Sequence, residues 1–406
     1  MAKYSDTPFA YHQEIEFDID ALTNLGVGLG RIDKWVVMVP YALPGERIRA
    51  RVWRNHANHS QADLIAILRA SPHRVDAHCS LFGTCGGCQY QHLSYEQQLG
   101  WKQQHVKDVL SRLAEVQCEV NDTHPSPVQW NYRTKLTPHF PRPRKDSFLP
   151  IGFMRTGSRR LVDVPQCPIA TEAINRTLHD LRERVRHQAG GQRRRGGTLL
   201  LRDTNGVVCT DPRAAVIEKV GSMQFHFQAG SFFQNNAHIL PAFLDYVIAQ
   251  ARADKVTHLL DLYCGVGVFS IWGHASFQRC MGIEVAEEAI AFALHNAILN
   301  SANSCDFIQG DAKDIFAQVS FDASHTCTIL DPPRKGCDTD FLDQLLNYKP
   351  ARIVYVSCDP ATQARDLKPL LAAGYRLEEV QPFDLFPQTR HIENVITLSY
   401  ASHAAG

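Results

Sequence analysis

No apolar run in this sequence of 406 residues approaches the ~18 side chains that a membrane-spanning helix needs. Residues 1–14 also lack the apolar core of a secretory signal peptide. We therefore expect a cytoplasmic protein that does not insert into a membrane. Because thiols of cytoplasmic proteins normally stay reduced, the 12 cysteines argue for packing, metal binding or catalysis rather than for a disulfide framework.

Net charge is absent as well, since 42 lysines and arginines balance 42 aspartates and glutamates. A zero balance argues at first sight against a polyanionic partner, but the local distribution of charge matters more than its sum. Basic residues gather in the middle of the chain, where they could contact phosphates: Arg142, Arg144, Lys145, Arg155, Arg159, Arg160 and the run Arg193 to Arg195. Glycines flank that last run on both sides, which favours a solvated loop there.

The segment at residues 257–267 (THLLDLYCGVG) predicts a buried strand that runs into a glycine-containing turn. Glycines let such a turn approach a nucleotide closely, and the next predicted strand ends at Glu284, whose carboxylate can accept both ribose hydroxyls. The third glycine of the dinucleotide fingerprint is missing, so a tight turn without a ligand is the alternative. Because Glu284 follows one strand–helix–strand step later, we favour a nucleotide site.

Strand-like segments then recur, separated by helical patterns such as residues 286–300. They lie at residues 305–309, 327–330, 353–356 and 394–400. This alternation predicts a doubly wound parallel sheet that is covered by helices on both faces. Since ligands of such sheets gather beyond the carboxyl ends of the strands, Glu284, Asp331 and Cys358 should converge in one crevice.

Cys358 stands where an apolar strand ends and a helix-like segment begins, in the run SCDP (357–360). At that place backbone N–H groups and the positive end of the helix can favour the thiolate, as a nucleophile requires. The alternative is a small buried core residue, which is the commoner fate of an isolated cysteine. The proline-stiffened loop DPPR (331–334) brings Asp331 and Arg334 to the same edge, although Arg334 could equally be a solvated residue paired with Asp338.

A second constellation consists of Cys79, Cys85, Cys88 and, far downstream, Cys167. Cys85 and Cys88 are separated by two glycines that can turn both sulfurs toward one metal centre, and Cys167 precedes a proline, as is familiar from iron–sulfur ligation. The residues themselves leave structural zinc and an iron–sulfur cluster open. Other cysteines have no ligand spacing and are expected to pack in the core, among them Cys118, Cys209, Cys264 and Cys305.

Four motifs resemble, in order and spacing, those of the RNA uracil-5-methyltransferase family, which uses S-adenosylmethionine. They are DLYCGVG (261–267), ILDPPRKG (329–336), VSCDPATQARDL (356–367) and FPQTRHIENV (386–395). The resemblance covers nearly the whole chain, and it implies that Cys358 is the nucleophile and Glu393 the general base. It also implies contacts with the methyl donor at Gln234, Tyr263, Glu284, Asp311 and Asp331.

The same resemblance implies a four-iron, four-sulfur cluster ([4Fe-4S]) on Cys79, Cys85, Cys88 and Cys167, with an architectural role. One position departs from the family pattern. Several relatives have a polar asparagine after the second glycine of the turn, whereas this chain has Val268. A hydrogen bond to the donor is therefore missing at this position or supplied by another residue.

The chemistry of uracil explains why a thiol and a carboxylate are needed. Carbon 5 is too weak a nucleophile to take a methyl group directly, but addition of the Cys358 thiolate at carbon 6 leaves an enolate whose charge reaches carbon 5. A base must then remove the proton from carbon 5 so that the thiol can leave, and Glu393 can be that base. The uridine has to be flipped out of folded RNA, because a stacked base does not admit a thiol and a methyl donor together.

Residues 1–72 contain short alternating strands that predict a small β-barrel of the oligonucleotide-binding type. The pattern LGxGxGR (25–31) looks like a TRAM domain, a common RNA-binding appendage, and a barrel that only supports its neighbour is the alternative. The sequence thus predicts an α/β protein of three parts. They are an RNA-binding barrel (1–72), a β-rich central domain with the iron–sulfur loop (73–250) and a Rossmann-like class I methyltransferase domain (251–406).

The expected substrate is RNA, with no obligate protein partner and no membrane. Large-subunit (23S) ribosomal RNA is preferred, because bacterial members of the resembling family that combine barrel and cluster act there, and transfer RNA remains open. Cytosine-5 methylation uses the same thiol addition and is a second enzymatic alternative. A non-catalytic RNA-binding protein that retains the fold is the alternative outside enzymes, against which the intact Cys358, Glu393, Gln234 and Asp331 argue.

Overall fold

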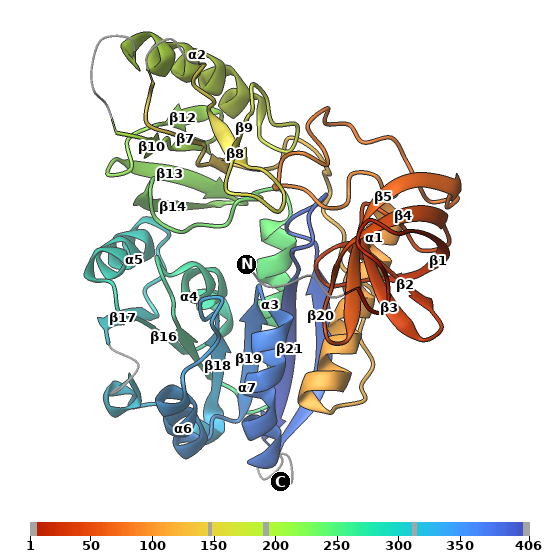
Figure 1. Cartoon of the computed structure of the whole chain (residues 1–406). Helices are drawn as coiled ribbons and strands as arrows, with labels where there is room; N and C mark the ends of the chain where they lie inside the picture. The colour runs from red at the N-terminus through yellow and green to blue at the C-terminus, as the bar shows by residue number, and fades with distance from the viewer. Residues whose placement is uncertain (1–5, 145–147, 190–194, 311–314, 401–406) are drawn as a thin grey trace. The chain divides into compact units, whose positions relative to one another are not determined.

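The computed structural model describes residues 6–144, 148–189, 195–310 and 315–400 (Figure 1). The chain divides into two compact units. The first comprises residues up to 105 together with 152–164 and 388–390, and the second comprises the remainder. Among the described residues, no helix combines the length and the apolar character that crossing a membrane requires.

Five strands near the amino terminus close into a barrel, which confirms the predicted β-barrel. They are β1 (Glu14–Leu22), β2 (Val27–Ile32), β3 (Trp35–Pro40), β4 (Arg47–Asn55) and β5 (His59–Arg69), in the spatial order β1-β2-β3-β5-β4. Residues of β1 and β4 alternate between buried and exposed, as the period of two in a half-buried strand requires. Phe17, Val37 and Ile48 are among the side chains that fill the barrel.

On the outer face of the barrel, acidic residues of β1 lie opposite basic residues of β4. The register places Glu16 opposite Arg49 and Asp18 opposite Arg47, and ion pairs join them at 2.9 and 3.1 Å. Arg69 of β5 adds a second contact to Asp18, also at 2.9 Å. Exposed pairs of this kind contribute little to stability. They do neutralise arginines that would otherwise make this face basic.

In the first unit, the cysteine-containing loop is bound to a hairpin. The hairpin is formed by β8 (Gly152–Met154) and β9 (Leu161–Asp163). The Gly86 amide donates to the Met154 carbonyl and the Thr156 amide donates to the Thr84 carbonyl, both at 3.0 Å. The hydroxyl of Tyr41, which follows β3, lies 3.2 Å from the Thr156 hydroxyl. The barrel, the cysteine loop and the hairpin are therefore joined by direct hydrogen bonds.

A seven-stranded sheet forms the centre of the second unit. Its strands are β15 (His258–Leu262), β16 (Arg279–Glu284), β17 (Cys305–Gln309), β18 (Thr326–Leu330), β19 (Arg352–Ser357), β20 (Tyr375–Phe383) and β21 (Glu393–Tyr400). They lie in the order β17-β16-β15-β18-β19-β21-β20; the first five are parallel, and β21 is antiparallel to both of its neighbours. The predicted strands are confirmed, but the sheet is mixed rather than parallel, because β21 runs antiparallel to β19 and to β20.

Helices cover both faces of this sheet, as the alternating pattern predicted (Figure 1). One face carries α3 (Leu240–Ala251), α4 (Val268–Gly273) and α5 (Glu287–Leu299), and the other carries α6 (Thr339–Tyr348), α7 (Pro360–Ala372) and the end of α1 (Tyr95–Val109). Strand β19 shows why its sequence is continuously apolar: Val354 and Val356 enter one core, and Ile353 and Tyr355 enter the other.

Short strands and one long helix make up the rest of the second unit. They are β6 (Lys135–Leu136), β7 (His139–Phe140), α2 (Glu172–Ala189), β10 (Gly197–Thr198), β11 (Leu201–Thr204), β12 (Val207–Cys209), β13 (Ala215–Val220) and β14 (Met223–Gln228). Single helical turns lie at η1 (Leu110–Ala114), η2 (His274–Ser276), η3 (Ile315–Gln318) and η4 (Ala323–His325). The hairpin β13–β14 is fastened to α5 by Asn296, which accepts from the His226 amide at 2.7 Å and donates to its carbonyl at 3.0 Å.

Candidate active site

One edge of the sheet brings the predicted nucleophile and the predicted base together. Strand β19 ends at Ser357, directly before Cys358, and β18 ends directly before Asp331. Strand β21 runs in the opposite direction, so that its first residue, Glu393, lies at this same edge, and the next residue, Asn394, is in register with Ser357. The antiparallel course of β21, which the sequence analysis did not predict, therefore places Glu393 beside Cys358.

The Cys358 thiol is surrounded by Arg334 and two carboxyl groups. Burial and the Glu393 carboxylate raise the pKa of the thiol to about 11. Arg334 opposes this shift through its charge and a hydrogen bond, and Asp331 adds to it. The expectation that this position favours the thiolate is therefore wrong, because the surrounding protein groups keep Cys358 protonated near neutral pH.

The start of α7 is capped by residues of the SCDP motif itself. Asp359 is the N-cap residue of α7, and its carboxylate accepts from the Ala361 amide at 3.0 Å. Pro360 has no N–H group, and the Asp359 amide donates to the Ser357 hydroxyl at 3.1 Å. The SCDP motif thus supplies its own cap. It leaves fewer N–H groups for the sulfur and adds a carboxylate at the start of the helix.

Glu393 and Asp331 are desolvated carboxyl groups that interact with each other. Glu393 is only 3% exposed, and its pKa lies well above the usual range because burial and the Asp331 carboxylate disfavour its charge, while Arg334 opposes the shift. Burial and Asp261 raise the pKa of Asp331 to about 7. Perturbed carboxyls that cluster around one thiol are typical of catalytic sites. The guanidinium of Arg334 is the cationic group that acts on both Cys358 and Glu393.

Asp261 belongs to this set, although the sequence analysis assigned it no role. It is fully buried on β15, where its carboxylate accepts from the Ser270 amide at 3.0 Å and from the Ser270 hydroxyl at 2.9 Å. Burial raises its pKa to about 7, and the charge of Glu284 contributes. Asp261 is the first residue of the DLYCGVG motif, and this position could have drawn attention to it. The motif does not show, however, that the Asp261 carboxyl is buried away from water.

Replacing Asp261 with asparagine is expected to make the stability of the protein less sensitive to pH. Because the pKa of Asp261 is raised to about 7 in the folded state, the folded protein keeps a proton that the unfolded chain loses above pH ~4. This contribution is fully present below pH ~4 and is lost as the pH rises through about 7, with a slope of at most about 1.4 kcal/mol per pH unit.

Urea unfolding between about pH 5 and about pH 8 measures this slope. The free energy of unfolding should fall less steeply with pH in Asp261→Asn than in the natural protein. Asp340→Asn, at an exposed aspartate of α6, is the matched control and should keep the natural slope. Equal slopes in all three proteins would contradict the raised pKa of Asp261.

The turn after β15 has the backbone shape that a closely approaching ligand needs. Gly265 and Gly267 have φ values of +54° and +85°, and Tyr263 has a φ of +64°, which is uncommon for a residue with a side chain. Glu284, at the end of β16, accepts from the Gly265 amide at 3.3 Å and from the Ala286 amide at 3.0 Å. Tyr263 and Glu284, two of the residues predicted to contact the methyl donor, therefore meet at one turn.

The segment of Gln234, between β14 and α3, is held by buried polar side chains. Arg202, which is 1% exposed, donates to the side-chain oxygen of Asn235 at 3.3 Å. Asn236 is equally buried and donates to the Leu385 carbonyl at 3.1 Å. Since Leu385 lies in the loop that leads into β21, the Gln234 segment is fastened to the connection that precedes Glu393.

Val268, where the sequence departs from the expected family pattern, begins α4 and packs its apolar side chain against the core. Asp311 lies outside the described residues, as do Lys145, Arg193 and Arg194 from the predicted basic stretch.

The four predicted cluster cysteines are divided between the units: Cys79, Cys85 and Cys88 lie in the first, and Cys167 lies in the second. Burial raises the pKa of Cys85, a hydrogen bond from the Gly87 amide opposes that shift, and Cys79 adds to it. Donation from backbone N–H to sulfur also occurs in iron–sulfur sites, so the thiols fit a cluster chemically. In the described part of the chain, however, no three side chains of histidine, cysteine, aspartate or glutamate are grouped as metal ligands.

Known proteins resemble this chain over almost its full length. The family model for tRNA (uracil-5-)-methyltransferase matches residues 215–401. A tRNA (uracil(54)-C(5))-methyltransferase of Schizosaccharomyces pombe is 38% identical and aligns with 97% of this chain and 80% of its own length. The protein of the same description from Saccharomyces cerevisiae is 33% identical, over 95% of this chain and 73% of its own length.

A solved structure of a protein with the same activity in its name resembles this chain over almost its full length in three dimensions. The tRNA (uracil-54, C5)-methyltransferase of Pyrococcus abyssi, in complex with S-adenosyl-L-homocysteine, matches with a TM-score of 0.73 and 25% sequence identity. The match covers 95% of this chain and 100% of the other. The agreement therefore includes both the barrel and the sheet rather than a shared nucleotide-binding core alone.

Proposed function

This chain belongs to the tRNA (uracil-5-)-methyltransferase family and uses S-adenosylmethionine to methylate carbon 5 of uracil in RNA, and we propose that its substrate is transfer RNA. The two yeast relatives and the archaeal structure are all named for uracil 54 of tRNA, and we propose the corresponding uridine as the target here. These relatives give no support to the large-subunit ribosomal RNA that the sequence analysis preferred, so ribosomal RNA becomes an alternative outcome of the test.

The test is methylation of purified transcripts with labelled S-adenosylmethionine, followed by mapping of the modified base. The label should enter 5-methyluridine in tRNA, and a transcript with cytidine in place of the target uridine should take up none. Label found only in 23S ribosomal RNA fragments would overturn the choice of tRNA. Label in 5-methylcytidine would identify cytosine as the base, and no transfer to any RNA would favour a non-catalytic RNA-binding protein.

The observation that carries the proposed mechanism is the meeting of Cys358, Glu393 and Arg334 at one edge of the sheet. Because Cys358 is protonated near neutral pH, the thiol has to release its proton to solvent before or during attack. A guanidinium beside the sulfur stabilises the thiolate, and Arg334 lowers the pKa of Cys358 in this way. We assign Arg334 the role of supporting the thiolate as it adds to carbon 6 of uracil.

The remaining steps return the thiol to its starting state. S-adenosylmethionine supplies the methyl group that carbon 5 takes up, with S-adenosylhomocysteine as the product. The Glu393 carboxylate then removes the carbon 5 proton, the double bond between carbons 5 and 6 forms again, and the bond from carbon 6 to sulfur breaks. Glu393 passes this proton to the departing thiolate, which restores both the thiol and the carboxylate. Burial raises the pKa of Glu393, so in its ionised form Glu393 is a stronger base than an exposed carboxylate, and the charge of Arg334 opposes the shift and favours that ionised form.

We propose that the methyl donor is held by Glu284, Tyr263, Gln234 and Asp331, with Asp311 as a further contact. The support is the turn that joins Glu284 to Gly265 and the archaeal structure that contains S-adenosyl-L-homocysteine. In this assignment the Glu284 carboxylate, now bound to two backbone amides, faces the donor's ribose hydroxyls.

RNA contacts are proposed for the barrel and for the exposed hairpin arginines Arg155, Arg159 and Arg160. The hairpin arginines lie on the segment that is hydrogen-bonded to the cysteine loop, which gives them a fixed support. On the barrel, the pairing of Arg47 and Arg49 with acids of β1 makes that face a poor phosphate site.

The division of the chain at residues 72 and 250 into barrel, central and catalytic domains is part of the same proposal.

We retain the proposal of a [4Fe-4S] cluster on Cys79, Cys85, Cys88 and Cys167, in place of structural zinc. Its support is the glycine-spaced pair Cys85 and Cys88, the distal Cys167 before a proline, and the amide donation to the Cys85 sulfur. The proposed role is architectural, because the methylation chemistry needs no electron transfer.

A further inference from the structure

The helix that follows the nucleophile buries polar side chains that the proposed reaction leaves without a role. Four residues of α7 are considered together here as the α7 polar residues: Thr362, Gln363, Arg365 and Asp366. Gln363 and Asp366 are 0% and 1% exposed. Burying an amide and a carboxylate costs free energy unless each is hydrogen-bonded, so their partners indicate what they do.

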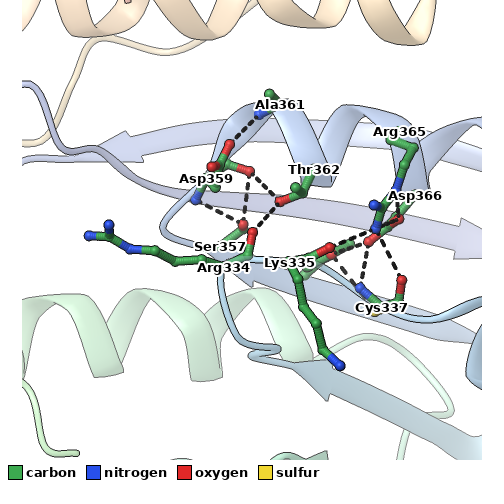
Figure 2. Close-up of polar contacts among 10 residues, drawn as sticks. Arg334, Lys335, Cys337, Ser357, Asp359, Ala361, Thr362, Arg365 and Asp366 are labelled. Carbon is green, nitrogen blue, oxygen red and sulfur yellow. Dashed lines mark hydrogen bonds and ion pairs between the residues drawn. The ribbon is translucent and has the colours of Figure 1, made fainter. Parts of the chain in front are cut away.

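Asp366 joins helix α7 to strand β19 and to the loop of Arg334, and Figure 2 shows its contacts with Cys337 and Arg365. Its carboxylate accepts from the Tyr355 hydroxyl at 2.7 Å, from the Cys337 amide at 2.8 Å and from the Arg365 guanidinium at 2.8 Å. Tyr355 belongs to β19, which ends at the nucleophile, and Cys337 belongs to the loop that carries Arg334. Hydrogen bonds to a charged acceptor are stronger than those between neutral groups, so the three bonds to the Asp366 carboxylate hold these segments firmly together.

The other α7 contacts hold the Arg334 loop by its backbone. Arg365 donates through one nitrogen to the carbonyls of Lys335 and Cys337, both at 3.0 Å. Thr362 donates to the Arg334 carbonyl at 3.2 Å. Figure 2 shows these contacts reaching from one helix to successive peptide groups of the loop.

Gly336 is the residue that permits this close approach. It has a φ of +74°, and a Cβ atom at this position would lie 2.5 Å from Arg365 Nη2 and 2.6 Å from an Asp366 carboxylate oxygen. The loop backbone therefore lies directly on the α7 polar residues, without an intervening side chain.

Gln363 makes a corresponding connection to the strand that carries the base. It donates to the Tyr355 carbonyl at 2.8 Å and to the Asn394 carbonyl at 3.2 Å, and it accepts from the Asn394 side chain at 2.7 Å. Asn394 is fully buried and directly follows Glu393. The same helix thus holds both the Arg334 loop and the start of β21.

We propose that the α7 polar residues are positioning residues for catalysis, which fix the Arg334 loop and the first residues of β21 in place around Cys358. The inference rests on the proposed roles of Cys358, Glu393 and Arg334. Helix α7 begins two residues after Cys358, so it serves as one rigid reference for the thiol, the guanidinium and the carboxylate. Displacement of a reacting group by about 1 Å can cost roughly 10²-fold in rate, which is the size of effect to expect.

The test compares Arg365→Ala with Lys368→Ala on the same helix. Arg365 is largely exposed and is fastened to the loop, whereas Lys368 is exposed and pairs with Glu115, away from the site. The main measurement is the rate of covalent adduct formation with RNA that contains 5-fluorouridine at the target, because fluorine at carbon 5 prevents release of the enzyme. Affinity for S-adenosylhomocysteine and the thermal midpoint are measured on the same samples.

Arg365→Ala should form the adduct roughly 10²-fold more slowly. Its affinity for S-adenosylhomocysteine should stay within about twofold of the natural value. The turn of Glu284 and Gly265 lies elsewhere, and Asp331 is held separately by its amide, which donates to the Leu262 carbonyl of β15 at 3.4 Å. Lys368→Ala should match the natural enzyme in both measurements. Arg365→Lys, which keeps a donor for the loop carbonyls, should restore part of the rate, a result that a general loss of stability would not produce.

Tyr355→Phe keeps the inference testable if Arg365→Ala does not fold, because it removes only the hydroxyl that donates to Asp366. A slower adduct rate with unchanged donor affinity is again expected. Equal adduct rates in Arg365→Ala, Tyr355→Phe and Lys368→Ala would overturn the inference. If the natural enzyme itself forms no adduct with fluorinated RNA, the proposed function fails instead, so the two failures are distinguishable.

Discussion

Glu393→Gln is expected to methylate its RNA once and then remain attached to it. Glutamine is similar in size but cannot accept the carbon 5 proton, so the reaction should stop after methyl transfer with the bond from sulfur to carbon 6 intact. The stalled species should survive denaturing electrophoresis and should carry both the RNA and the labelled methyl group. Multiple turnover should fall by roughly 10⁴-fold or more.

Cys358→Ala should fail at an earlier step, because it has no sulfur to add to carbon 6. It should bind RNA and donor with near-natural affinity, form no adduct and transfer no methyl group. The double variant should also form no adduct, which shows that the thiol supplies the link. Normal turnover by Glu393→Gln would mean that another residue or a water removes the proton, and turnover by Cys358→Ala would refute the thiol addition.

Anaerobically purified protein is expected to be brown and to contain iron and acid-labile sulfide, because thiolate-to-iron charge transfer absorbs visible light. Cys167→Ser should lose the colour as completely as Cys88→Ser, although the two positions lie far apart in the sequence. Loss of the cluster should also lower the thermal midpoint, since metal binding contributes to the stability of the folded state.

Cys118→Ser is the matched control for this experiment, because Cys118 is a half-buried cysteine without ligand spacing. It should keep the colour, the iron and the sulfide. Colourless protein with stoichiometric zinc would refute the cluster and support a zinc site on the same thiols. Colour that survives Cys167→Ser would remove Cys167 from the ligand set.

The central strands of the sheet could be predicted well from sequence because they are buried on both faces. Largely apolar runs at residues 327–330 and 353–356 correspond to β18 and β19. Strand β20 escaped prediction because its sequence, YRLEEVQPF, mixes charged residues and a proline with apolar ones, as suits an edge strand. The direction of β21 could not be read from periodicity, which is the same for a parallel and an antiparallel strand.

The candidate site was predicted by residue type but not by environment. Cys358 and Asp331 could be selected because they follow predicted strands, whereas Glu393 was selected only through the family resemblance. The structure places all three at one edge of the sheet. The state of the thiol was predicted wrongly, because the pKa of Cys358 depends on Glu393, Arg334 and Asp331, which are brought to it by other strands and loops. The contacts of Gln363 and Asp366 were equally out of reach, since their partners follow from tertiary packing.

A protonated Cys358 also affects what the enzyme does when no RNA is bound. With a pKa of about 11, only roughly one thiol in 10⁴ is ionised at neutral pH. Thiolates, and not thiols, attack alkylating agents and peroxides. An enzyme whose second substrate is itself a methylating agent is therefore protected from methylating its own nucleophile. Without RNA, the enzyme should react slowly with iodoacetamide at Cys358, and the arrival of uracil should be what makes this cysteine reactive.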